Sequence, residues 1–210
     1  MKMGKVSRSN AQNPPDFSKY HVVDDPNGIS ELKSFISAEL HVLEKDIDIS
    51  KLRNVEVAKP FMERLKKIQT ECGLNMPRIV ATDIIDGDEC CIASFKPFEN
   101  TFYISSRYFN SKDALLDTLR DWAKKGFIPE QCTSITYVAE HETTHIRLTN
   151  DATISEKAKR IFKKRKLLND NDAKINEYYA DAVAIFRTNK LLDANIIKVI
   201  EYLRERGVKI

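Results

Sequence analysis

The stretch Tyr137–His145 reads Tyr-Val-Ala-Glu-His-Glu-Thr-Thr-His and contains the pattern His-Glu-x-x-His. His141 and His145 are four positions apart, so in an α-helix both imidazoles leave the same face, one turn apart. At about 100° per residue, Glu142 lies beside that face. Two neutral imidazoles are good zinc ligands, and a neighbouring carboxylate can deprotonate a water molecule that the metal activates. The stretch therefore predicts a helix that carries a zinc site.

A second pattern lies downstream in the run 176–186, which also has the character of a helix. Glu177 and Asp181 are four residues apart and share a face with Ala180 and Ala184, whose small side chains allow another helix to approach closely. A catalytic zinc site uses three protein ligands and one open position. We expect Glu177 to be the third ligand. We expect Asp181 to accept a ring N–H from a ligating histidine and so to fix its tautomer.

The two patterns together resemble a known family. His-Glu-x-x-His followed by Glu-x-x-x-Asp on a later helix is similar to the gluzincin branch of the zincin metallopeptidases. The form Glu-x-x-Ala-Asp is also similar to that of HtpX-like membrane peptidases. The order of strand, helix and metal-binding helix between Tyr103 and His145 resembles zincin-type domains of phage head-associated and mobile-element proteins. The resemblance covers roughly residues 78–190, and its specific part is the two short motifs.

This resemblance implies a zincin-like fold and a peptidase that acts on a peptide or protein substrate. It implies that His141, His145 and Glu177 bind Zn²⁺ and that Glu142 is the general base. The family often supplies a further His or Tyr that stabilises the oxyanion, but no motif here identifies that residue. Tyr178 is one candidate, although a tyrosine in this position on a buried helix is more typical of packing.

Composition sets the broad class. The 210 residues are enough for one hydrophobic core, and 34 basic against 31 acidic residues give a net charge of only +3. No apolar run approaches the roughly 18 residues that a membrane span needs, and no apolar stretch follows the N-terminal residues. We therefore expect a cytoplasmic protein without a membrane segment. Four reduced thiols fit that expectation, namely Cys72, Cys90, Cys91 and Cys132.

The chain is expected to have three parts. Residues 1–27 are polar and interrupted by prolines, which predicts a flexible N-terminal arm. Residues 28–75 form a helical N-terminal segment, with Ser30 as N-cap of the first helix, and residues 76–210 form the zincin-like metallopeptidase domain. The expected class is α+β, mostly helical with a small three-stranded antiparallel sheet before the metal-binding helix. Its predicted strands are Arg78–Ile84, Cys90–Phe95 and Thr101–Ser105.

In zincins a strand that precedes the metal-binding helix borders the cleft, and Thr101–Ser105 is our candidate for that strand.

Between the motifs, the segment 157–166 carries seven positive charges in ten positions, a pattern typical of nucleic-acid or anionic surfaces. We favour a solvated helix there, because the whole chain is not basic.

Three alternatives to a general peptidase stay open. The first is a zinc-stabilised structural or binding module of a phage-like element that does not catalyse a reaction. The second is a regulatory peptidase that acts on a repressor, with the basic segment as its docking surface. The third is a pair of helices that contain these residues without binding a metal.

Overall fold

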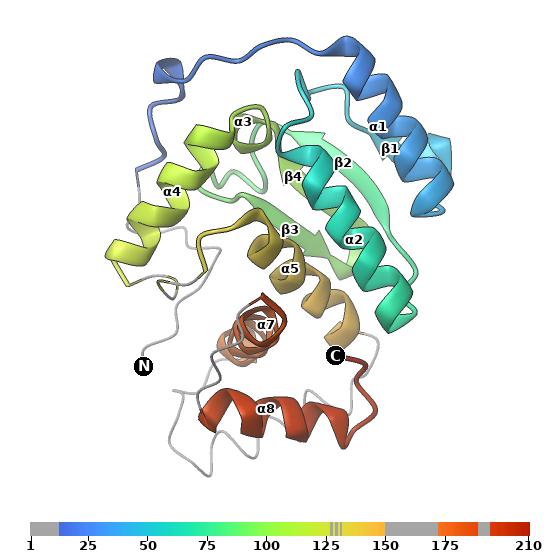
Figure 1. Cartoon of the computed structure of the whole chain (residues 1–210), viewed down its shortest axis with the longest axis vertical. Coiled ribbons are helices and arrows are strands. Elements are labelled where there is room, and N and C mark those ends of the chain that lie inside the picture. Colours follow the sequence, from blue (N-terminus) through green and yellow to red (C-terminus); the bar gives the residue numbers. More distant parts are fainter. Residues whose placement is uncertain (1–12, 127, 129, 131, 150–171, 189–193) are drawn as a thin grey trace.

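The computed structural model describes residues 13–126, 128, 130, 132–149, 172–188 and 194–210 (Figure 1). These residues form an α+β fold in which helices surround a small mixed sheet. The basic segment 157–166 lies outside the described residues. Among the residues described, no helix is both long and apolar enough to cross a lipid bilayer.

The sheet has four strands in the order β1-β2-β4-β3. Strands β1 and β2 pair in parallel, as do β2 and β4, whereas β3 pairs with β4 antiparallel. A parallel pair needs a crossover connection, and helix α2 supplies it between β1 and β2. The strands are β1 Ile47–Asp48, β2 Arg78–Thr82, β3 Ala93–Lys96 and β4 Thr101–Ser105.

The expected three-stranded antiparallel sheet is therefore wrong in strand number and in pairing. The connection 83–92 leads from β2 to β3 at the edge of the sheet and leaves room for one strand between them. The chain then turns back at Asn100, which is left-handed with φ of 47°, and β4 fills the position between β2 and β3. Phe102 and Ile104 of β4 are fully buried, as a central strand requires. The edge strands are β1 and β3, so Thr101–Ser105 is paired on both sides and cannot take an extended substrate as a further strand, contrary to the prediction.

Several helix ends follow local signals. Ser111 caps α4 by accepting the Ala114 N–H at 3.2 Å, and Gly73 ends α2 with φ of 64°. Helix α1 begins earlier than expected, because Asp25 rather than Ser30 provides its cap by accepting the Gly28 N–H at 2.8 Å. The helices are α1 Pro26–Glu39, α2 Ala58–Cys72, α3 Ser106–Phe109, α4 Lys112–Lys124, α5 Ile135–Thr149, α7 Asp172–Thr188 and α8 Ala194–Arg204.

Helix α5 lies at the centre of the packing. It contacts α2 and the edge strand β3 on one side and α7 on the other, and α7 in turn packs against α8 (Figure 1). One hydrophobic core joins these elements and runs from Leu32 to Val208, so the segment 28–75 and the segment 76–210 share it. The described part of the N-terminal arm also docks, because the Phe17 ring packs edge-on against Tyr108 at 5.0 Å.

Candidate metal centre

Helices α5 and α7 bring two imidazoles and one carboxylate together. The Nε2 atoms of His141 and His145 lie 3.3 Å apart. Glu177 places Oε2 at 3.3 Å from Nε2 of His141 and Oε1 at 3.5 Å from Nε2 of His145. One donor atom from each residue can thus be chosen so that all three lie within 4.8 Å of one another.

This spacing fits a tetrahedral zinc site. With metal–ligand bonds of about 2.0–2.2 Å and tetrahedral angles, two ligand atoms stand about 3.3 Å apart. The two Nε2 atoms lie at that separation, and each has one oxygen of the Glu177 carboxylate at 3.3 or 3.5 Å. Two imidazoles and a carboxylate are also ligand types that zinc accepts. His141 is buried, but the side chains of His145 and Glu177 remain 17% and 22% exposed. The cluster is therefore open to solvent on one side, as a fourth ligand position requires.

In the metal-free protein, the pKa values of the two histidines are shifted in opposite directions. Burial opposes a charge on His141, but hydrogen bonds to Asp181 and Glu177 outweigh it and raise the pKa of His141 well above its usual value. Burial and the neighbouring His141 charge lower the pKa of His145 to about 4. His141 is therefore the protonated ring and His145 the neutral one. A proton on Nε2 of His141 can be donated to Nε2 of His145, which accounts for the short distance between these two atoms.

Zinc binding is expected to release at least about one proton per ion at neutral pH, because His141 must be neutral to bind a metal. The affinity for zinc should then rise by about tenfold or more for each pH unit until pH reaches the pKa of His141. Calorimetric zinc titrations in two buffers with different protonation enthalpies measure the proton release directly. A zinc affinity that is constant between pH 6 and pH 8 would contradict this assignment.

Asp181 lies behind His141. Its Oδ1 atom is 2.9 Å from Nδ1 of His141 and also accepts the Tyr137 hydroxyl at 2.5 Å. Asp181 and Tyr137 are both buried, and burial raises the pKa of the Asp181 carboxyl despite the hydrogen bonds that favour its charged form. This pair directs Nε2 of His141 towards Glu177. Tyr137 was not predicted as a site residue, although its position four residues before His141 places it on the same helix face.

The variant Tyr137→Phe is expected to destabilise the protein by about 1.5–3 kcal/mol, because it removes a hydrogen bond to a buried carboxylate. It should also weaken zinc binding, since Asp181 would lose one of the groups that orient it. Chemical denaturation and zinc titration give the two values. Tyr108→Phe is the matched control, because the buried Tyr108 hydroxyl donates to a neutral acceptor, the Glu89 carbonyl, at 3.3 Å. Equal zinc affinities in the two variants would remove Tyr137 from the site.

Glu142 is held at the edge of the sheet. Its Oε2 atom accepts the backbone N–H of Phe95, in β3, at 3.2 Å. Burial raises the pKa of Glu142 to about 8, although the His141 charge and the Phe95 N–H favour the ionised form. A cation at the neighbouring ligands would stabilise the carboxylate and lower this pKa. Glu142 is therefore a buried carboxylate beside the three potential ligands, and the Phe95 N–H fixes its orientation.

Tyr178 has the contacts of a packing residue. It is half-buried against the core, and its ring lies 6.5 Å from that of Tyr179. The Tyr179 ring stacks on Tyr202 of α8 at 6.3 Å. The hydroxyl of Tyr137, by contrast, reaches the centre through its hydrogen bond to Asp181.

The assembled centre thus consists of His141, His145 and Glu177, with Glu142 at one side and Asp181 behind. Comparison with known proteins adds no relative: no family model, curated protein or solved structure matches the chain.

Proposed function

We propose that this protein is a zinc-dependent metallopeptidase with a zincin-like arrangement of its metal-binding helices. The observation that carries the proposal is the convergence of His141, His145 and Glu177, whose ligand atoms lie within 4.8 Å of one another, with a second carboxylate, the buried Glu142, beside them. A purely structural zinc site is usually closed by four protein ligands. The described residues contribute three to this cluster, and Glu142 lies next to it without being one of them. That arrangement favours hydrolysis over a structural role.

Zinc, when bound, would supply a Lewis acid that polarises a carbonyl oxygen and lowers the pKa of water. Glu142 accepts a proton from the water that attacks the scissile carbonyl and then delivers a proton to the leaving amine. The hydrogen bond from the Phe95 N–H holds the Glu142 carboxylate in one orientation for both proton transfers. Asp181 keeps the His141 ring in one tautomer and one orientation.

The position of β3 supports a peptide or protein as substrate. An edge strand presents backbone groups to which an extended peptide can add as a further strand. Strand β3 is at the sheet edge, contacts α5, and donates the Phe95 N–H to Glu142. The Phe95 N–H is already donated to Glu142, so a peptide that pairs with other backbone groups of β3 would pass beside the general base. Its backbone would provide affinity, and side-chain pockets would provide specificity.

Metal analysis combined with a cleavage assay tests the proposal. We expect one zinc per chain, cleavage of a denatured protein or of an extended peptide library, loss of cleavage with a chelator and recovery on adding zinc. Bound zinc without cleavage of either substrate would favour the non-catalytic module instead. A protein without bound zinc, and with no affinity for it, would refute both functions.

A further inference from the structure

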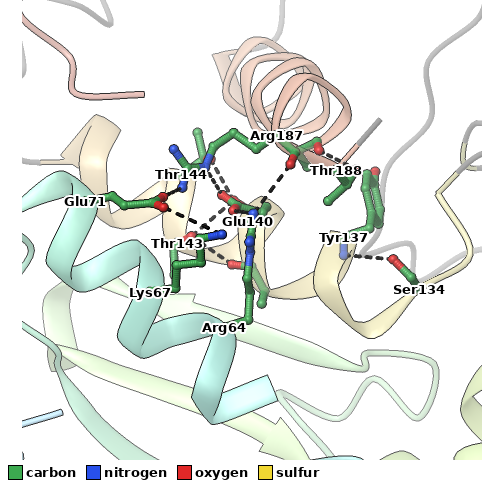
Figure 2. A network of polar contacts seen from close by, with 12 residues as sticks. Arg64, Lys67, Glu71, Ser134, Tyr137, Glu140, Thr143, Thr144, Arg187 and Thr188 are labelled. Atoms are coloured by element: carbon green, nitrogen blue, oxygen red, sulfur yellow. Dashed lines mark hydrogen bonds and ion pairs between the residues drawn. The ribbon is translucent and has the colours of Figure 1, made fainter. Parts of the chain in front are cut away.

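Glu140 is the residue immediately before the first histidine, and it is completely buried. At about 100° per residue, its side chain leaves α5 on a different face from the two histidines. Its carboxylate is surrounded by guanidinium groups (Figure 2). Oε1 accepts a hydrogen bond from Arg64, and Oε2 accepts from Nε of Arg187 at 2.7 Å and from Nη2 of Arg147 at 3.2 Å. A buried carboxylate needs partners of this kind, because an unpaired charge in the interior is strongly destabilising.

These arginines come from three helices. Arg64 belongs to α2, Arg147 to α5 itself, and Arg187 to the last turn of α7. Arg187 also pairs with Glu71 of α2, so it holds both neighbouring helices at once (Figure 2). The planar guanidinium fixes the direction of each hydrogen bond as well as its length. The network therefore fixes the end of α7 relative to α5 and α2.

We propose that Glu140 is a positioning residue that sets the orientation of α7 and so places Glu177 against the two histidines. This inference rests on the metal site of the proposed function, but it concerns binding of the metal rather than cleavage. Helix α7 packs closely against α5, and Glu177 itself contacts both histidines. Among the described residues, two further polar contacts join the helices: Asp181 at His141 and Tyr137, and Arg187 at Glu140. Glu177 lies beyond the first of these contacts.

The dimensions of α7 show why the second attachment matters. Along an α-helix, Arg187 lies about 9 Å from Asp181, and Glu177 lies about 6 Å from Asp181 in the opposite direction. With Asp181 alone as a pivot, a tilt of about 10° would move Glu177 by about 1 Å. Metal–ligand distances tolerate about 0.2 Å. The pairing of Glu140 with Arg187 removes this freedom, so that the carboxylate of Glu177 meets the imidazoles without reorganisation.

The test is a double-mutant cycle on zinc affinity with Glu140→Gln and Glu177→Ala. Glutamine keeps the shape of Glu140 but loses the charge that holds the arginines. In the parent, Glu140→Gln should raise the dissociation constant for zinc by about 10–100-fold. In the Glu177→Ala background, where His141 and His145 remain, the same substitution should leave the dissociation constant unchanged, because Glu140 acts through Glu177. Circular dichroism establishes that each variant is folded at the temperature of the titration.

A second pair of variants separates positioning from stability. Leu32 is buried on α1, a helix that packs against α2 and β1, so Leu32→Ala leaves a cavity beneath α1. This variant should have a lower thermal midpoint and an unchanged zinc affinity. If Glu140→Gln does not fold, Arg187→Lys replaces it in the cycle, since lysine keeps the charge but lacks the fork that reaches Glu140 and Glu71 together.

If Glu140→Gln binds zinc as tightly as the parent, the proposal is overturned. It is also overturned if Glu140→Gln weakens zinc binding as much in the Glu177→Ala background as in the parent, or if Leu32→Ala weakens it as much as Glu140→Gln does. A parent protein that binds no zinc would overturn this inference together with the proposed function. A parent that binds zinc but cleaves nothing, with the cycle behaving as expected, would overturn only the peptidase assignment.

Discussion

Glu142→Gln is expected to lower peptide hydrolysis by about 10²–10⁴-fold while leaving one zinc per chain, because it removes the general base and none of the metal ligands. Glutamine is nearly the same size, and its carbonyl oxygen can still accept the Phe95 N–H. The loss should appear in kcat, since the proton transfers occur in the chemical step. Steady-state kinetics on a fluorogenic peptide, with zinc content measured on the same samples, gives both values.

The same substitution has a consequence for stability. The pKa of Glu142 is raised to about 8 in the folded, metal-free protein, whereas an unfolded glutamate titrates near 4.3. The folded state therefore binds the proton more tightly, and ionisation of Glu142 destabilises the metal-free protein as pH rises through this interval. Metal-free Glu142→Gln should be more stable than the parent at pH 9.

Glu99→Gln is the control for Glu142→Gln, because Glu99 is an exposed carboxylate in the turn between β3 and β4. It should change neither the hydrolysis rate nor the zinc content. If Glu142→Gln cleaves the peptide as fast as the parent, Glu142 has no part in the mechanism, whatever the zinc content.

The variant His145→Ala is expected to contain no zinc after purification and to lose the stabilisation that zinc provides. A ligand that binds only the folded state stabilises it by about 2.7 kcal/mol at a free concentration of one hundred times its dissociation constant. The parent should therefore show a higher thermal midpoint when zinc is added, whereas His145→Ala should not. Elemental analysis and thermal unfolding with and without zinc give the two results.

His21→Ala serves as the control for the histidine substitution, because His21 is exposed in the N-terminal arm. It should keep one zinc per chain and the full response of the thermal midpoint. One zinc per chain retained in His145→Ala would remove this residue from the ligand set and with it the tetrahedral arrangement proposed here.

The sequence alone determined the features that depend on residues close together in the chain. Helical periodicity places His141 and His145 on one face of α5, and the same spacing places Glu177 and Asp181 on one face of α7. The capping side chain at Ser111 and the left-handed Gly73 mark helix ends by local backbone chemistry. These signals extend over one or two turns and need no knowledge of distant partners.

Only the tertiary structure decided which distant segments meet. Order along the chain predicts that β2 and β3 are neighbours, but the connection 83–92 places β3 at the edge with β4 between them. No short-range pattern in the sequence indicates that path. Tyr137 is joined to Asp181, and Glu140 to Arg187, by contacts between residues more than forty positions apart. Burial, which raises the pKa of Glu142, is likewise a property of the packed molecule. Spacing along one helix fixes the direction of a side chain, whereas its partner and its proton affinity depend on what packs against it.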